Sequence, residues 1–197
     1  MVRKTDEELI AMFQTGDAAA FEALFNRYKA PIFVFLVRQC GNRDIAADLT
    51  QDVFTKLLNR ADTFRHQSRF STWIYTIARN TAMDHVRKAK HRNHASLDAA
   101  SSDDGPALIE KVSDDGPTPE RGSKAGELQK ALATAIDKLP VDQREVFILR
   151  EYHGMPFAEI AEVVDAKIGT VKSRMRYALE ALRLELHQYE EYAKELL

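Results

Sequence analysis

The sequence predicts an all-α protein made of two small helical domains. Apolar side chains recur at helical spacing in both halves, beginning with Leu9 and Met12. No stretch keeps the alternation of a strand for more than a few residues. Between the halves, residues 96–123 hold two Asp-Asp-Gly-Pro repeats and few large apolar side chains, which is typical of a flexible linker. We therefore expect domains at residues 1–95 and 124–197, joined by this linker.

The N-terminal part is expected to be helical throughout. The period that begins at Leu9 continues through Phe21 to Tyr28. Pro31 marks either a break or the first turn of the next helix, because proline has no backbone N–H to donate. The remaining predictions are a turn at Gly41-Asn42, a helix from about Asp44 to Asn59, and a helix capped by Ser71 or Thr72 that runs to about Lys90.

The C-terminal part is expected to resume helical structure at about Gly126. Pro140 suits the first turn of the next helix, which ends at His153-Gly154. Two helical patterns follow, from Phe157 to Val164 and from Gly169 onward, separated by a tight turn at Asp165 to Ile168. In the last helix the residues expected to be buried are Val171, Met175, Ala178, Leu179 and Leu182.

The net charge of −2 conceals an uneven distribution. Residues 79–92 and 167–183 each hold five basic residues against one acid. Residues 96–120 hold seven acids against Lys111. The two basic segments are expected to meet nucleic acid, and the acidic linker separates them.

A short helix, a turn and a basic second helix are the elements that place side chains in the DNA major groove. Arginine pairs with guanine edges, while lysine and serine suit phosphate contacts. A solvated basic face is the alternative interpretation, but the cluster near the start of the second helix favours DNA. The predicted DNA contacts of this helix are Thr170, Lys172, Ser173, Arg174, Arg176 and Tyr177.

The segment LPVDQREVFILREYHGMPFAEIAEVVDAKIGTVKSRMRYALEALR resembles the σ4 domain of extracytoplasmic-function sigma factors, the smallest class of bacterial σ70-type initiation factors. The order of LP, R-x-V-F, LRE, G, EIA and GTVKSR carries this resemblance. The chain departs from the pattern at two positions. Asp165 replaces the common turn glycine and tolerates left-handed geometry better than most residues. Lys167 stands where a capping residue is usual, so that cap is missing.

The N-terminal half resembles the σ2 domain of the same family. AADLTQDVF resembles the acidic helix that docks on the clamp helices of RNA polymerase, with Ala47 in place of a common acid. Leu49 and Val53 are expected to face the core, and a polar, acidic face suits a basic coiled-coil partner. In isolation this pattern would indicate an ordinary solvated face. The polymerase contacts that the resemblance implies are Asp48, Leu49, Gln51, Asp52 and Phe54.

Residues 70–88 resemble the strand-opening and −10 recognition segment of the family. Opening DNA requires a place for an unstacked base and positive charge along the single strand. The loop from Arg65 to Arg69 is the candidate base pocket. Trp73 is favoured as a core residue, and Asp84 is expected to orient an arginine. The contacts implied for the −10 element are Arg65, His66, Ser71, Thr72, Trp73, Thr76, Arg79, Asn80, Arg87 and Lys88.

No catalytic, metal or cofactor site is expected. His91 and His94 have helical i, i+3 spacing, but no Cys or Asp completes a site, so solvated histidines are favoured. Cys40 is the only cysteine, which excludes an internal disulfide. No apolar run approaches a membrane span and the N-terminus lacks the apolar core of a signal peptide, so a cytoplasmic location is expected.

The resemblance implies an alternative sigma factor, not an enzyme, that binds core RNA polymerase and directs promoter-specific initiation. A stand-alone helix-turn-helix regulator with a sensing N-terminal domain is the alternative. The resemblance also implies an anti-sigma partner, and a route for the acidic linker along the RNA-exit path of the polymerase. Residues 184–197 are predicted to form an amphipathic helix that extends the last helix or docks on the domains.

Overall fold

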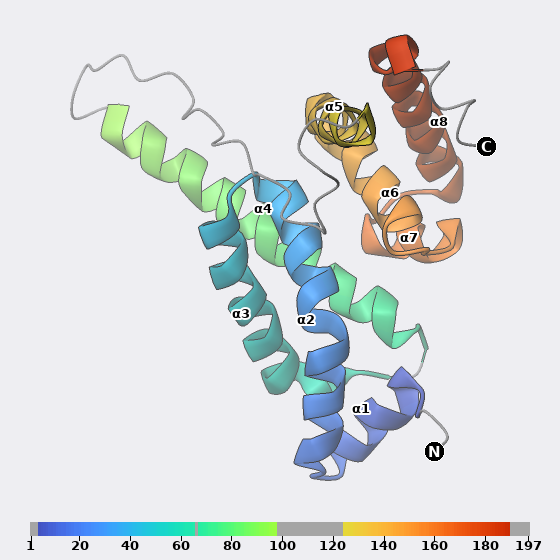
Figure 1. The fold of residues 1–197 in the computed structure, drawn as a ribbon. Helices are drawn as coiled ribbons and strands as arrows, with labels where there is room; N and C mark the ends of the chain where they lie inside the picture. The colour runs from blue at the N-terminus through green and yellow to red at the C-terminus, as the bar shows by residue number, and fades with distance from the viewer. Residues whose placement is uncertain (1–3, 66, 98–123, 190–197) are drawn as a thin grey trace. The chain divides into compact units, whose positions relative to one another are not determined.

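The computed structural model of the chain describes residues 4–65, 67–97 and 124–189, with backbone alone at residues 89–97, 124 and 125. The chain divides into two compact units, which we describe separately. All regular structure in the described residues is helical (Figure 1), as the sequence predicts. Residues 98–123 of the predicted linker and residues 190–197 of the predicted C-terminal tail lie outside the described residues, whereas residues 96 and 97, also predicted to be linker, belong to the last helix of the first unit.

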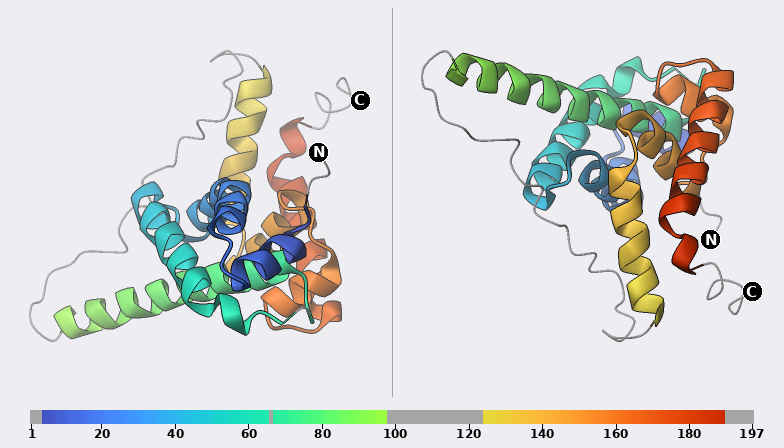
Figure 2. Two further views of the ribbon diagram at one scale, coloured as in Figure 1. Left: turned by 90° about the horizontal axis from the view of Figure 1, so that it is seen from below. Right: turned by 90° about the horizontal axis from the view of Figure 1, so that it is seen from above.

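The described residues of the first unit form four α-helices and one 3-10 turn, and Figure 1 labels the α-helices. Their bounds are α1 Asp6–Gln14, α2 Ala18–Cys40, α3 Arg43–Arg60, η1 Ala61–Thr63 and α4 Phe70–Leu97. Helices α2, α3 and α4 pack against one another, and α1 contacts α2, η1 and α4. Side chains buried completely at this junction include Leu24, Ile32, Phe35, Leu57, Phe70 and Ile74. In both views of Figure 2 the C-terminal part of α4 extends beyond the other helices of this unit.

Helix termini in the first unit are closed by side chains that the sequence places there. Thr5 caps α1 in a reciprocal capping box with Glu8. Asp17 caps α2, and Asn42 caps α3. Gly41 ends α2 in the left-handed conformation with a φ of 69°, which glycine adopts without steric cost. Local sequence therefore determines where these helices start and stop.

Two predictions about helix boundaries in the first unit are wrong. Helix α2 runs through Pro31 without a break, because its apolar stripe, which includes Leu24 and Ile32, is buried on one continuous helix. That burial offsets the lost hydrogen bond, whose loss costs roughly 3 kcal/mol. Ser71 and Thr72 lie inside α4 and do not cap it, since the helix already begins at Phe70.

The second unit contains α5 Lys124–Lys138, α6 Val141–Glu151, α7 Phe157–Val163, α8 Ile168–Glu185 and the 3-10 turn η2 His187–Tyr189. Helix α8 packs on α6 and α5. Ile136, Ile148, Leu149 and Ile160 are completely buried. Pro140 stands at the N-cap of α6, as its position in the sequence predicts to within a residue.

The predicted buried stripe of α8 is confirmed at Val171, Met175, Ala178 and Leu182. Leu179 is the exception, because 49 % of it is exposed. It lies about 100° around the helix from Ala178, beyond the stripe that the other helices cover. This leaves an apolar side chain on the outer face of α8.

Candidate nucleic-acid and protein interfaces

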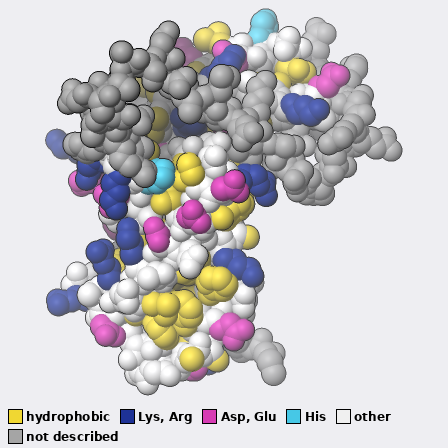
Figure 3. Space-filling model, turned by 90° about the vertical axis from the view of Figure 1, so that its left-hand side faces the viewer, with side chains coloured by type: hydrophobic (Ala, Val, Ile, Leu, Met, Phe, Trp, Pro, Cys, Tyr) yellow, Lys and Arg dark blue, Asp and Glu magenta, His cyan; other side chains and the backbone are white. Residues whose placement is uncertain are grey.

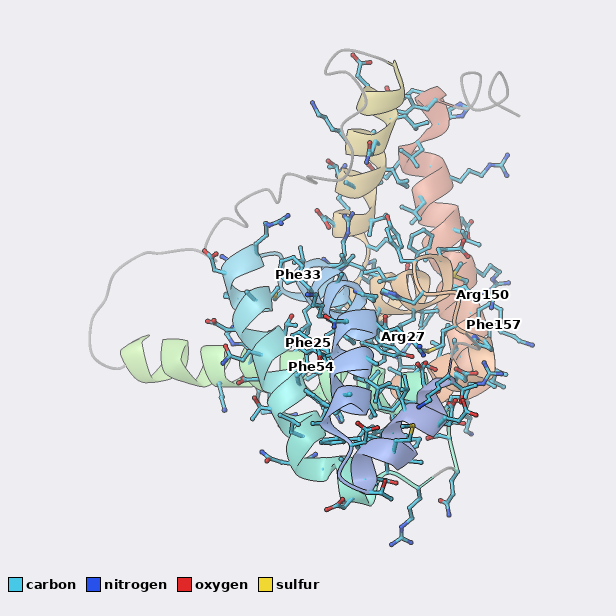
Figure 4. All side chains as sticks on the ribbon, turned by 60° about the horizontal axis from the view of Figure 1, so that its bottom comes forward. Phe25, Arg27, Phe33, Phe54, Arg150 and Phe157 are labelled. Carbon is cyan, nitrogen blue, oxygen red and sulfur yellow. The ribbon has the colours of Figure 1, made fainter. Side chains whose placement is uncertain are left out.

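An apolar groove of about 550 Å³ lies between α2 and α3. Aromatic rings line it: Phe25 and Phe54 meet edge to face with centroids 4.7 Å apart, and Figure 4 shows both between the two helices. Leu58 stands at the groove with 46 % of its surface exposed. On the face drawn in Figure 3, hydrophobic side chains likewise gather over the first unit. The other groove residues are Phe21, Lys29, Ala30, Phe33, Ala47, Thr50, Gln51 and Thr55.

The residues predicted to contact polymerase divide into two sets. Asp48, Gln51 and Asp52 are exposed on α3. Leu49 is only 5 % exposed and Phe54 only 4 %, so both pack inward. Leu49 therefore packs in the core of the first unit, whereas the ring of Phe54 lines the groove. The structure thus brings a polar, acidic helix face beside an aromatic groove.

The predicted −10 contacts lie on α4 and the loop before it. Asn80, Arg87 and Lys88 are exposed on α4, whereas Thr76 and Arg79 are half-buried. The prediction for Asp84 is confirmed, because its Oδ1 lies 3.4 Å from Nη1 of Arg87. Arg65 is exposed, and His66 lies outside the described residues.

Ser71, Thr72 and Trp73 lie in the first turn of α4 and differ in burial. Thr72 is buried at 3 % exposure, so it supports the helix and does not reach DNA directly. Trp73 is half-buried against Phe64 and Phe70, with ring centroids 5.2 Å and 6.0 Å away. Trp73 therefore packs partly in the core, where the sequence favours it. Ser71 is half-buried.

The turn between α7 and α8 has the geometry that a helix-turn-helix requires. Asp165 adopts a φ of 50°, the left-handed conformation for which this position usually uses glycine. Lys167 is the N-cap of α8 and makes no side-chain cap hydrogen bond, as predicted. The first turn of α8 therefore leaves backbone N–H groups available to an anion such as a phosphate.

The predicted −35 contacts share the exposed face of α8. Thr170, Lys172, Ser173, Arg176 and Tyr177 are all exposed. The guanidinium of Arg176 lies 4.9 Å from the ring centroid of Tyr177, so the two form one cationic and aromatic surface.

Arg174 differs from the other basic residues of α8. Its Nη2 lies 2.6 Å from Oδ2 of Asp142 on α6, and only 24 % of its side chain is exposed. The ion pair ties α8 to α6. Arg174 is therefore bound within the protein, and its predicted role in reading a base would require that pair to open.

The turn before α7 is held by Arg150. Its Nη1 donates to the carbonyl of Met155 at 3.1 Å, and its guanidinium lies 4.8 Å from the ring centroid of Phe157 (Figure 4). Gly154, which lies between Arg150 and Met155 in the sequence, has a φ of 63°. Burial lowers the pKa of the adjacent His153 to about 4, so this histidine is neutral near pH 7.

Among the residues that the structure describes, no group of three or more His, Cys, Asp or Glu side chains is placed to hold a metal ion. His91 and His94 lie on α4 where side chains are not described. Cys40 donates to the carbonyl of Leu36 at 2.9 Å, and burial raises the pKa of its thiol. No helix in the described ranges is long and apolar enough to cross a membrane.

Sequence reasoning missed the contribution of α2 to the groove. Phe21, Phe25 and Phe33 recur at intervals of four and eight residues, which places them on one helix face. That spacing is in the sequence, but it equally describes a core stripe. The half-buried state of these rings, visible only in the fold, separates the two interpretations.

The arrangement matches known protein families in both units. Residues 24–92 match the model described as Sigma-70 region 2, and residues 129–182 match Sigma-70, region 4. The chain is 34 % identical to the ECF RNA polymerase sigma-E factor of Haemophilus influenzae, over 90 % of this chain and 93 % of that protein. It is 32 % identical to the ECF RNA polymerase sigma factor SigW of Bacillus subtilis, over 90 % of this chain and 94 % of SigW.

Solved structures show the same fold. The sigma factor RpoE of Bartonella quintana, in complex with the anti-sigma factor NepR, superposes with a TM-score of 0.64 at 25 % identity, covering 85 % of this chain and 96 % of RpoE. CnrH in complex with the cytosolic domain of CnrY gives a TM-score of 0.65 at 23 % identity, over 94 % of this chain and 99 % of CnrH.

Proposed function

Because this chain belongs to the extracytoplasmic-function RNA polymerase sigma factors, we propose that its two units divide the work of promoter-directed initiation. Residues 1–95 bind core polymerase and the −10 element, and residues 124–197 bind the −35 element. Sigma factors are initiation factors without catalytic activity of their own, and the polymerase makes the RNA. The partners of this chain are core RNA polymerase and promoter DNA.

The polymerase-docking surface is the exposed face of α3 together with the α2–α3 groove. Asp48 and Asp52 supply negative charge, and Phe54 and Leu58 supply apolar contact next to it. A charged rim beside an apolar centre is the usual anatomy of a protein interface. The carboxylates would guide a basic helical partner, while burial of the rings would supply most of the affinity.

The −10 element is bound as a single strand along α4. Asn80 and Arg87 lie on one face of α4, with Arg79 and Lys88 on either side of it, and these residues would follow the strand backbone. The exposed side of Trp73 and the loop from Arg65 to Arg69 would receive an unstacked base. The partly exposed ring supports this assignment, since stacking requires one free face of the ring.

The −35 element is bound as a duplex by α8. Lys172 and Ser173 would meet phosphates near the start of the helix, and Arg176 would reach base edges in the major groove. Tyr177 adds an exposed aromatic edge beside Arg176. Arg174 would act mainly by holding α8 on α6 through Asp142.

Regulation by an anti-sigma factor fits this family. The RpoE structure of Bartonella quintana contains NepR, and we propose that this chain also has an anti-sigma partner that competes with polymerase. We place its action in the cytoplasm, where core polymerase meets chromosomal DNA. Of the acidic linker predicted at residues 96–123, residues 98–123 lie outside the described residues. If it follows the RNA-exit path, replacing its seven acids with serine will alter initiation or promoter escape.

The observation that carries the proposal is the pairing of an acidic, aromatic-lined docking face in one unit with a basic recognition helix in the other. Run-off transcription with core polymerase tests it directly. The full chain should direct initiation from a cognate promoter, and the double variant Asp48→Lys and Asp52→Lys should lose holoenzyme assembly. Tight binding to a duplex operator without polymerase would instead identify a stand-alone regulator. A chain truncated after Leu184 tests in the same assay whether the tail matters.

A further inference from the structure

Residues 64–69 join η1 to α4, and the structure describes all of them except residue 66. The two ends of this loop are both tied to α1. At one end, Nε2 of Gln14 donates to the carbonyl oxygens of Ala61 at 2.8 Å and Phe64 at 3.1 Å. At the other end, Oε1 of Glu7 accepts from the backbone N–H of Phe70 at 3.1 Å. These hydrogen bonds span 47 to 63 residues of sequence, so they are tertiary contacts and not local turns. Figure 1 shows α1 beside this connection.

Glu7 and Gln14 are two helical turns apart, which places them on one face of α1. Seven residues of α-helix rise about 10 Å, so a rigid helix sets the separation of the two anchor points. Both side chains are half-buried, which limits competition from water. The carboxylate of Glu7 also complements the positive end of the α4 dipole.

Helix α1 is itself fixed to α2. Asp6 forms an ion pair with Arg27 and accepts a hydrogen bond from the hydroxyl of Tyr28 at 2.5 Å. The ring of Tyr28 packs edge to face on Phe70, the first residue of α4, at 5.3 Å. Phe70 and Phe64 are also in contact, at 5.9 Å. Phe64 and Phe70, at the two ends of the loop, therefore belong to one aromatic cluster with Tyr28, which is hydrogen-bonded to Asp6 on α1.

We propose that α1 is a positioning element for −10 recognition, in which Glu7 and Gln14 hold residues 64–69 in the shape that selects an unstacked base. This rests on the proposed −10 role of the first unit and extends it to a helix outside the matched Sigma-70 region 2 segment, which begins at residue 24. Neither side chain touches DNA. They act by fixing the backbone on which Arg65, Arg69 and Trp73 stand.

The variants that test this remove the hydrogen bonds and retain side-chain bulk. Gln14→Met removes the amide donor, and Glu7→Met removes the acceptor. Glu7→Gln keeps a carbonyl oxygen at the same place and should rescue function. Matched controls are Gln129→Met and Glu22→Met, at exposed positions on α5 and α2.

The measurement is base preference by reconstituted holoenzyme. The duplex −35 sequence is first selected with wild-type holoenzyme. A fork-junction DNA library then joins this duplex to a randomised single-stranded −10 part. Bound DNA is sequenced, and core affinity and helical content are measured in parallel. We expect Gln14→Met and Glu7→Met to reduce enrichment of the preferred base by about 2- to 10-fold, the factor equivalent to one net hydrogen bond. Retention on the duplex part and core affinity should stay at wild-type values.

The possible failures point to different conclusions. Wild-type holoenzyme that enriches no base would refute the −10 role of the first unit. Wild-type enrichment that persists unchanged in both variants would overturn the role of α1 alone. Loss of core affinity in proportion to base preference, or absence of rescue by Glu7→Gln, would reduce α1 to a support of the fold and also overturn it. Should Glu7→Met fail to fold, Gln14→Met decides the test at the other end of the loop.

Discussion

Lys172 and Arg174 stand two residues apart on α8, yet their side chains have different partners. Lys172 is exposed, whereas Arg174 is held by Asp142 across to α6. Residue type alone assigns both to DNA. The ion pair instead makes Arg174 a residue that orients the recognition helix, and charge-assisted pairs of this kind fix geometry as well as contributing energy.

A double-mutant cycle at Asp142 and Arg174 should show coupling. We expect Asp142→Ala and Arg174→Ala to destabilise the chain non-additively, with a coupling free energy of about 0.5–1 kcal/mol, since one partner is exposed. Urea unfolding of the single and double variants measures it. Lys172→Ala is the control and should leave the free energy of unfolding unchanged. Additive effects at Asp142 and Arg174 would contradict the structural role.

His153 should make stability depend on pH. Burial lowers its pKa to about 4 in the folded chain, below the ordinary 6.5 expected after unfolding. Between these values the unfolded chain binds more protons, so stability is present above pH 6.5 and is lost as pH falls toward 4. With about 1.4 kcal/mol per pH unit, the loss is on the order of 2–3 kcal/mol.

The variant His153→Gln should flatten this part of the profile. Urea unfolding at pH 7, 5.5 and 4, followed by circular dichroism, gives the slope for each chain. The matched control is His187→Gln, at an exposed position near the end of the described chain. Parallel slopes for wild type and His153→Gln would show that this imidazole is not the group responsible.

At the scale of single elements, α2 serves both the core and the surface. Its inward stripe closes the first unit, while Phe21, Phe25 and Phe33 face the groove with α3. Because two helices pack through only part of their circumference, a second apolar stripe on α2 remains accessible. Such accessible apolar area beside charge is typical of interaction sites.

Leu58→Lys should weaken assembly with core polymerase. Leu58 is 46 % exposed at the groove, so its replacement removes apolar contact without opening the core. A loss of about 1–2 kcal/mol corresponds to roughly 5- to 30-fold in affinity. Val34→Lys is the matched control, since Val34 is 39 % exposed on α2 but does not line the groove. Fluorescence anisotropy with labelled chain and core polymerase distinguishes the two, and equal affinities would exclude the groove from the interface.

Replacing Gly154 and Gly169 with alanine should change the free energy of unfolding in opposite directions. Gly154 has a φ of 63°, so Gly154→Ala should destabilise the second unit by roughly 1–2 kcal/mol. A Cβ at Gly169 in α8 would meet nothing within 4 Å, so Gly169→Ala should stabilise it by about 0.5–1 kcal/mol. Thermal unfolding measures both. The same sign for the two changes would contradict this account.

At the scale of the whole molecule, a net charge of −2 accompanies two basic surfaces. Long-range attraction to DNA is weak for such a chain. At low salt, acidic residues elsewhere in the chain repel DNA and oppose the attraction of the basic segments, and at high salt both the attraction and the repulsion are screened. Affinity for promoters must then come largely from polymerase. This suits a factor that selects a site for an enzyme it accompanies.

Duplex DNA binding by the full chain alone should therefore be weak and should strengthen when core polymerase is added. In the holoenzyme, Lys172→Ala should reduce the slope of log affinity against log salt concentration by about one, as expected for one lost phosphate contact. Lys130→Ala, at an exposed position on α5, is the control. Tight binding without polymerase, or an unchanged slope for Lys172→Ala, would contradict the assignment.

The helices of this chain follow from local patterns, and the main misplacements have tertiary causes. Pro31 does not interrupt α2 because packing on α3 and α4 outweighs its missing hydrogen bond. The start of α4 at Phe70 is stabilised by Glu7, which is 63 residues away and has no local signature. The predicted burial of Leu179 is wrong because the spacing of apolar residues does not specify how wide a stripe of α8 the neighbouring helices cover.

By itself, the sequence determined the all-α class, the two-part organisation, the helix-turn-helix and the charge of its second helix, since apolar periodicity, turn residues and charge order are local properties. Only the tertiary structure decided that Arg174 is tied to Asp142, that Phe54 and Thr72 are buried, that aromatic rings of α2 and α3 share a groove, and that α1 holds both ends of the loop before α4. These features join residues distant in sequence. Their contacts depend on how the helices pack, which the local pattern does not specify.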